Sequence, residues 1–302
     1  MWSSSPARGG VIDTWLRRGA AGFRLDVADE LPDEFIEKVR AAVKRVSPEK
    51  FLLGEVWEDA TTKFGFNKRR TYLLGKGLDS VMNYPFKNAV LDFVKGKPAE
   101  QAMTEILTIC EHYPAPAMDT ALNFLSTHDT ERALTVIADE PANGRGREWQ
   151  SGRCVTGDAY EEGLLRLRMA YAIIYTLPGV PCLYYGDEIA MQGYRDPFNR
   201  AFFRWDAHEQ RLRPVLAQLA QLRHTCEAFR TGQLRVLRAE DGILHYQRVG
   251  KVETAEIIVN RTEHIIVETL ASGKSTEVNP MGFTIVVEEV GHNPNHSYYD
   301  YV

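Results

Sequence analysis

The sequence predicts an α/β protein with a small antiparallel β-sandwich at its C-terminal end. Short apolar runs at 21–27, 51–56 and 121–126 indicate strands that end close to a carboxylate. Strands alternate with helical segments up to residue 231, an order that is typical of a parallel sheet. From residue 232 the apolar residues recur with period two, which indicates antiparallel strands. We therefore expect an α/β domain in residues 1–231, a β-sandwich in 232–290 and a loose tail in 291–302.

The individual elements follow from periodicity and turn signals. Residues 32–46 place Ile36, Val39 and Val43 on one side of an amphipathic helix. A Leu-Pro-Gly turn at 177–179 opens a further strand. The other expected helices are 11–18, 86–94, 99–112, 162–175 and 210–230, and the strands of the α/β domain are 21–27, 51–56, 79–85, 121–126 and 180–186. The strands expected in the β-sandwich are 234–237, 243–248, 254–260, 265–268 and 282–287.

Composition and charge indicate a soluble globular protein. Hydrophobic residues make up 44% of the 302 residues and charged residues 25%, with 36 Lys and Arg against 41 Asp and Glu. This balance gives no reason to expect a nucleic-acid partner or a membrane surface. The N-terminal residues 1–10 contain no apolar run of signal-peptide length, and no segment reaches the roughly 18 apolar residues of a membrane span. The four cysteines are far apart and form no CxxC pair, so we expect reduced thiols and a cytoplasmic location.

Three carboxylates, Asp26, Glu55 and Asp129, each follow one of the apolar strands. The carboxyl ends of parallel strands form the active-site edge of a (β/α)8 barrel. Arg24 and Asp26 are two residues apart, so they share one face of their strand. For that strand alone, a structural ion pair between them is the alternative interpretation. The three acids together, in this order, indicate glycoside chemistry.

The motifs around these acids resemble the alpha-amylase family (glycoside hydrolase family 13), and most closely its neopullulanase and cyclomaltodextrinase branch. The matching segments are GFRLDVA at 22–28, GEVW at 54–57, VMNYP at 81–85, FLSTHDTER at 124–132, YYGDE at 184–188 and DPFNR at 196–200. The resemblance implies that residues 1–231 form the C-terminal part of a (β/α)8 TIM barrel, strands 4 to 8. Barrel strands 1 to 3, with the family's Asp and His at strand 3, find no match. We therefore expect a C-terminal fragment whose activity is impaired by truncation.

The resemblance assigns catalytic roles residue by residue. Asp26 matches the nucleophile, and Arg24 matches the cation that holds it ionised and oriented. Glu55 matches the residue that acts first as general acid and then as general base. Asp129 matches the third acid, which binds sugar hydroxyls and favours the distorted ring. His128 resembles a hydrogen-bond donor to the transition state, with a core histidine as the alternative, and retention of anomeric configuration is implied.

Four further residues are candidates for substrate binding. Glu30 matches a position that borders the +1 subsite, and Trp57 is a candidate for stacking on a sugar ring. Asp196 and Arg200 match positions near the donor-side subsites. The alternatives are ordinary packing for Trp57 and simple closure of a loop for Asp196 and Arg200.

The resemblance implies retaining hydrolysis of α-1,4-glucosidic bonds in maltodextrins, cyclodextrins or pullulan. An inactive α-glucan-binding fragment and a transglycosylase of the same family are the alternatives, and the motifs at 57–59 and 82–85 favour the hydrolytic branch. No cofactor is expected. Full-length relatives can hold calcium, but its ligands lie mainly in the unmatched part, so we expect no metal site here. An open barrel leaves a strand edge unpaired, so we expect self-association, such as a homodimer, or poor folding.

Overall fold

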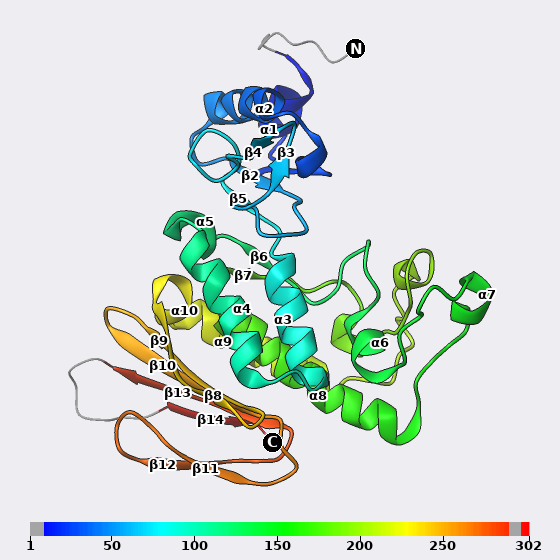
Figure 1. Ribbon diagram of the computed structural model, residues 1–302, viewed down its shortest axis with the longest axis vertical. Coiled ribbons are helices and arrows are strands. Elements are labelled where there is room, and N and C mark those ends of the chain that lie inside the picture. Colours follow the sequence, from blue (N-terminus) through cyan, green and yellow to red (C-terminus); the bar gives the residue numbers. More distant parts are fainter. Residues whose placement is uncertain (1–8, 290–296, 302) are drawn as a thin grey trace. The chain divides into compact units, whose positions relative to one another are not determined.

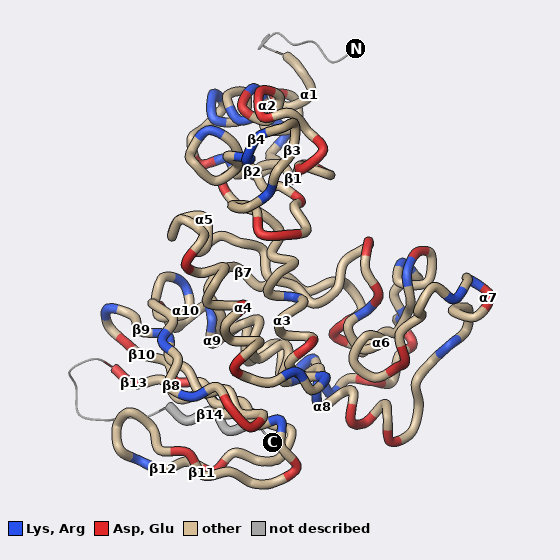
Figure 2. Tube along the Cα trace, viewed as in Figure 1, with Lys and Arg blue, Asp and Glu red and all other residues tan. Residues whose placement is uncertain are grey.

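The computed structural model describes residues 9–289 and, for the backbone, 297–301. The chain forms two compact units (Figure 1), the first made of Met1–Pro85 with Leu107–Leu122, and the second of Phe86–Ile106 with Asn123–Val302. This division cuts through the expected α/β domain and leaves the C-terminal strands in the second unit. Lys and Arg are interspersed with Asp and Glu along the described chain (Figure 2), in keeping with its mixed composition. The described residues include no helix that could cross a membrane.

A parallel sheet forms the centre of the first unit. Its strands are β1 (Gly22–Leu25), β2 (Phe51–Gly54) and β5 (Ser80–Val81), hydrogen-bonded in the order β1-β2-β5. Gly22 lies opposite Phe51, and a Cβ atom at Gly22 would come within 2.0 Å of the Phe51 carbonyl oxygen. The close approach of these two strands therefore requires glycine at that position.

Helices and a small hairpin surround this sheet within the first unit. Helix α2 (Asp33–Val46) contacts helix α1 (Val11–Arg17) and β2, with Ile36, Val39 and Val43 buried. The amphipathic pattern predicted for residues 32–46 is thus confirmed. The remaining elements are the 3-10 helix η1 (Ala28–Glu30), the antiparallel pair β3 (Phe64–Gly65) and β4 (Lys68–Arg69), and helix α5 (Ala115–Asp119).

The strands of the central sheet, β1, β2 and β5, are parallel, as predicted, but shorter than the sequence suggested. Strand β5 has two residues where 79–85 was expected. Beyond it, the Asn83 N–H donates to the Leu122 carbonyl (2.8 Å), and helix α3 (Tyr84–Lys95) begins at the next residue. Pro85 lies in the first turn of α3, where a missing N–H costs no hydrogen bond.

Helix α8 (Gly157–Thr176) is the longest helix of the second unit that the structure describes, and all its residues from 169 to 174 are buried. A helix that is apolar on every side is stable only when it is covered on every side. Its contacts include helix α9 (Leu212–Thr225) and the C-terminal strands. The other elements of this part are α4 (Ala99–His112), which continues from the second unit into the first, β6 (Leu122–Asn123), α6 (Ala133–Ala138), α7 (Arg147–Gln150), β7 (Val180–Pro181), η2 (Asp187–Ile189), η3 (Phe198–Arg200) and α10 (Ala228–Thr231).

The C-terminal strands form a five-stranded antiparallel sheet in the order β14-β13-β10-β9-β8. A hairpin of two strands packs against it through an apolar cluster that contains Ile243, Ile258, Leu270, Val278 and Val286. The seven strands are β8 (Gln233–Glu240), β9 (Ile243–Val249), β10 (Glu253–Asn260), β11 (Ile266–Thr269), β12 (Ser275–Val278), β13 (Gly282–Glu289) and β14 (Ser297–Tyr301).

One fold prediction is confirmed in part, and another needs correction. No sheet of the described residues closes into a barrel, so the predicted part of a (β/α)8 barrel is confirmed only as an α/β arrangement with parallel strands. The tail expected in 291–302 lies partly outside the described residues, but Ser297–Tyr301 forms β14 and pairs with β13. The edge of β13 offers free backbone groups to this segment, and antiparallel pairing satisfies them.

Candidate active site

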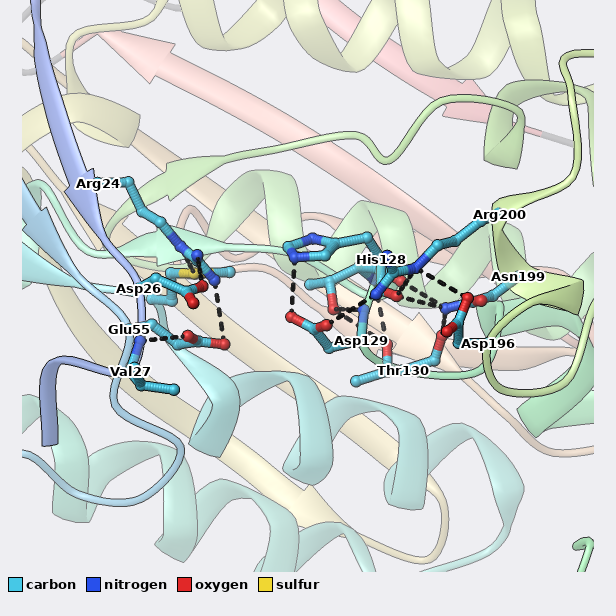
Figure 3. A network of polar contacts seen from close by, with 12 residues as sticks. Arg24, Asp26, Val27, Glu55, His128, Asp129, Thr130, Asp196, Asn199 and Arg200 are labelled. Carbon is cyan, nitrogen blue, oxygen red and sulfur yellow. Dashed lines mark hydrogen bonds and ion pairs between the residues drawn. The ribbon is translucent and has the colours of Figure 1, made fainter. Parts of the chain in front are cut away.

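Glu55 lies at the centre of a polar cluster in the first unit. Its side chain is 4% exposed, and one oxygen, Oε1, contacts Arg24 Nη2 (3.0 Å) and accepts from Trp57 Nε1 (3.1 Å) and the Tyr84 hydroxyl (3.4 Å). The other oxygen accepts the backbone N–H of Val27 at 2.8 Å. Figure 3 shows Arg24 reaching from β1 towards the Glu55 carboxylate and Val27 on its other side. A buried carboxylate with this many donors is held in one orientation.

Asp26 forms an ion pair with the same Arg24 guanidinium, through Nη1. Its side chain is 73% exposed, in contrast to that of Glu55. The backbone beyond it turns sharply, because Val27 adopts a left-handed conformation (φ 42°) that directs its N–H to Glu55. Adjacent nitrogens of one guanidinium thus bridge two carboxylates, one accessible and one buried. Arg24 thus pairs with both acids, and the catalytic role predicted for it stays a prediction.

The two other predicted residues of the first unit lie at its surface. Trp57 stacks on Tyr84 with ring centroids 4.4 Å apart and an interplanar angle of 13°, yet remains 44% exposed. Trp57 therefore packs against Tyr84 and remains accessible, and its stacking on a sugar ring stays a prediction. Glu30 is exposed at the end of η1, where its N–H donates to the Val27 carbonyl (2.9 Å). Its part in substrate binding stays a prediction.

In the second unit the structure brings together the remaining four predicted residues. His128 Nε2 lies 2.9 Å from Asp129 Oδ2, and Arg200 Nη2 lies 3.2 Å from Asp129 Oδ1. Arg200 Nε also contacts Asp196 Oδ1 (3.3 Å) and donates to the His128 carbonyl (2.9 Å). Figure 3 shows these side chains as one connected network. All four side chains are partly exposed, so His128 is not the core histidine of the alternative interpretation.

Sequence reasoning missed a buried group that adjoins this network. Arg132 is fully buried, with its guanidinium 4.7 Å from the Tyr184 ring centroid and 4.9 Å from that of Tyr185. It donates to the Tyr185 carbonyl (2.6 Å) and contacts the Asp187 carboxylate (3.2 Å). Burial raises the pKa of Asp187 to about 6, although hydrogen bonds from Tyr171 and other groups lower it. Arg132 is the last residue of the motif FLSTHDTER at 124–132, which was the available signal for it. Nothing in the sequence indicated that its side chain is buried.

Among the described residues, no group of three or more His, Cys, Asp or Glu side chains is arranged to hold a metal ion. The polar clusters consist of carboxylates already paired with arginine or histidine. Such an arrangement suits proton transfer and hydrogen bonding to a neutral polyol more than coordination of a cation.

Comparison with known proteins identifies one family and several relatives of this chain. The alpha-amylase catalytic domain family matches residues 7–231. A cyclomaltodextrinase of Geobacillus thermopakistaniensis is 33% identical over 259 residues, which cover 83% of this chain and 39% of that protein. Neopullulanase 2 of Thermoactinomyces vulgaris is 31% identical over 275 residues, 88% of this chain and 42% of that protein.

Solved structures agree with this result. The ligand-free cyclic alpha-maltosyl-(1→6)-maltose hydrolase of Arthrobacter globiformis superposes with a TM-score of 0.77 at 25% identity, over 92% of this chain and 58% of that one. The chain thus spans about two fifths of the length of the curated relatives that it matches. By the match of its residues 7–231, the chain belongs to the alpha-amylase family of glycoside hydrolases, family 13.

Proposed function

We propose that this chain carries the machinery for retaining hydrolysis of α-1,4-glucosidic bonds in maltodextrins, cyclodextrins or pullulan. The observation that carries the proposal is Arg24, which holds the accessible Asp26 and the buried Glu55 on neighbouring nitrogens. Carboxylates held by one guanidinium are close together. Retaining enzymes space their two carboxyl groups by about 5–5.5 Å, whereas inverting enzymes need about 6.5–9.5 Å to admit a water.

In the proposed first step, an oxygen of Asp26 bonds to the anomeric carbon while the bond from that carbon to the glycosidic oxygen breaks. Glu55 gives its proton to the leaving oxygen. In the second step a water attacks the anomeric carbon, Glu55 takes the water's proton, and the bond to Asp26 breaks. Arg24 lies on both carboxylates, so it can follow the negative charge as it moves from Asp26 to Glu55.

For the second unit, we propose that Asp129, His128, Arg200 and Asp196 bind sugar hydroxyls. Their partly exposed carboxylates, imidazole and guanidinium offer both acceptors and donors, the combination that a polyol needs. The relatives include a cyclomaltodextrinase and a neopullulanase, and one similar solved structure is a cyclic alpha-maltosyl-(1→6)-maltose hydrolase in complex with maltose. These names support a glucan substrate class and do not choose among its members.

The test is release of reducing sugar from maltoheptaose and γ-cyclodextrin by the purified chain. We expect Asp26→Asn and Glu55→Gln each to lower the rate by about 10²–10⁴-fold, because each removes one proton-transfer or bond-forming group. Glu37→Gln is the matched control, since Glu37 is an exposed carboxylate on α2, and it should keep the full rate. Early products should have the α-configuration by NMR.

Other outcomes would favour the alternatives. Products longer than the substrate would indicate a transglycosylase of the same family. Binding of maltoheptaose by a folded but inactive wild type would indicate an α-glucan-binding chain, and β-configured products would contradict the retaining mechanism. Light scattering of the same sample tests the homodimer.

A further inference from the structure

Residues 127–130, which carry His128 and Asp129, are joined by local hydrogen bonds. The Thr130 N–H donates to the Thr127 carbonyl at 3.4 Å, the Asp129 N–H donates to the Thr127 hydroxyl at 3.1 Å, and the Thr127 N–H donates to the Thr130 hydroxyl at 3.1 Å. Three carbonyl groups of this segment also contact a residue far along the chain. The Asn199 amide nitrogen donates to the carbonyls of His128 (2.8 Å) and Thr130 (2.8 Å), with Thr127 at 3.4 Å.

The direction of the Asn199 amide is set by this arrangement. A side-chain amide has two N–H donors on its nitrogen and none on its oxygen, and the reverse orientation would place oxygen against three carbonyl oxygens. Asn199 Oδ1 has no hydrogen-bond partner among the described residues, although it is buried. The amide nitrogen of Asn199 therefore bonds to the carbonyls of residues 127–130, which carry two candidate site residues, while its oxygen accepts no hydrogen bond among the described residues.

Asn199 is itself fixed in the fold. It lies in η3 and is fully buried, and its carbonyl accepts the Tyr184 hydroxyl at 3.4 Å. Phe198, the residue before Asn199, lies so close to Gly193 that a Cβ atom on Gly193 would be 2.4 Å from the Phe198 carbonyl oxygen. The adjacent Arg200 binds the His128 carbonyl and the Asp129 carboxylate. Consecutive residues thus hold the backbone and the side chains of one loop.

We propose that Asn199 is a positioning residue, which fixes the backbone of residues 127–130 so that His128 and Asp129 face the substrate together. The expected effect of Asn199 on the rate rests on the proposed function. Its expected effect on the backbone of residues 127–130 does not. Misplacement of a substrate-binding group by about 1 Å can lower a rate by about 10²-fold. A residue that only stabilises the fold would instead act equally on the whole molecule.

The chain offers a matched control in Asn260 of the C-terminal sheet. Asn260 is also fully buried, and its amide donates to three carbonyls, those of His264 (2.8 Å), Asn279 (3.0 Å) and Val278 (3.1 Å). Asn199→Ala and Asn260→Ala each remove an amide that donates to three carbonyls. Asn260→Ala also removes the bonds that Asn260 Oδ1 accepts from the N–H (2.9 Å) and hydroxyl (2.7 Å) of Thr262. We expect both to lower stability, but only Asn199→Ala to speed hydrogen exchange at the amides of 127–130, by tenfold or more relative to wild type.

The rate measurement adds a second readout. We expect kcat/KM for maltoheptaose to fall about 10²-fold in Asn199→Ala and to stay within twofold in Asn260→Ala. Asn199→Ser, which keeps one donor, should recover part of the rate. Faster exchange spread over the whole chain, or an unchanged kcat/KM in a folded Asn199→Ala protein, would overturn the proposal. So would failure of both Asn199 variants to fold while Asn260→Ala folds, since the role would then be global.

Failure of the proposed function and failure of the positioning role of Asn199 give different results. A wild-type chain without glucan activity would contradict the proposed function, while the exchange experiment would still decide whether Asn199 holds residues 127–130. Faster exchange confined to residues 127–130 in Asn199→Ala would support the positioning role even then. Faster exchange spread over the whole chain would refute it.

Discussion

Replacing Asp187 by Asn should change how the stability of this protein depends on pH. Asp187 is 2% exposed and accepts hydrogen bonds from Tyr171 (2.7 Å) and Arg132 (3.2 Å). Burial is the largest influence on its carboxyl and raises the pKa from 3.8 to about 6, because the charged form loses water. The Asn side chain has a similar shape and cannot ionise.

The size of the effect follows from the pKa. A rise from 3.8 to about 6 is about two units, and each unit is worth about 1.4 kcal/mol, so ionising Asp187 in the folded protein costs about 3 kcal/mol. The folded state holds the proton more tightly than the unfolded state. The contribution of Asp187 to stability is therefore fully present below about pH 4 and is lost as the pH rises through about 6.

Urea denaturation of wild type and Asp187→Asn at several pH values between 4 and 8 measures this effect. We expect the variant to gain about 3 kcal/mol relative to wild type over that range. Asp79→Asn is the control with the opposite sign. Burial favours a raised pKa for Asp79, but hydrogen bonds from Lys44, Arg40 and the Leu52 N–H lower it from 3.8. Wild type therefore loses its advantage over this variant only as the pH falls below about 4, so this control is also measured at lower pH. A difference between wild type and Asp187→Asn that stays constant with pH would refute the reasoning.

Two further predictions concern other parts of the chain. Val27→Asn should raise the free energy of unfolding by about 1 kcal/mol, because a β-branched residue is strained at φ 42° and Asn tolerates that region; a lower urea midpoint would contradict this. Glu256→Gln should lower the free energy of unfolding at pH 7 by about 1–3 kcal/mol. Burial acts to raise the pKa of Glu256, but hydrogen bonds from His245, Gln247 and the Ala271 N–H lower it, so denaturation curves of the two proteins should converge as the pH falls below 4.5.

The sequence predicted those features that depend on neighbours along the chain. Period-two patterns located β8, β9, β10 and β13, and the two-residue spacing of Arg24 and Asp26 predicted that they share a strand face. Strand β12 (Ser275–Val278) escaped prediction because it is short and mostly polar. It is a strand only because it pairs with β11 and because Val278 enters the apolar cluster of the sheet.

The residues that sequence reasoning missed make contacts between distant parts of the chain. Asn199 lies 69 to 72 residues from the carbonyls that it binds, and Arg132 lies 55 residues from Asp187. Arg132 directly precedes α6 and Asn199 lies in the three-residue η3, and neither stretch is long enough for periodicity to indicate which side chain is buried. A polar residue in such a segment is usually exposed, so burial with several hydrogen bonds is visible only in three dimensions.

Asp26 and Glu55 differ in strand pairing and in exposure, and this difference suits the separate roles proposed for them. Both acids directly follow a strand, and in the sequence only the resemblance to the family distinguishes their roles. In the structure the Glu55 N–H donates to the Leu25 carbonyl, and the Glu55 carbonyl accepts the Ala28 N–H, each at 3.0 Å, so Glu55 stays within the hydrogen-bonded part of the sheet. Asp26 precedes the left-handed turn at Val27 and remains accessible. An accessible carboxylate can reach an anomeric carbon, and a buried one surrounded by donors is oriented to pass a proton, which is the division of roles that two-carboxylate glycoside chemistry requires.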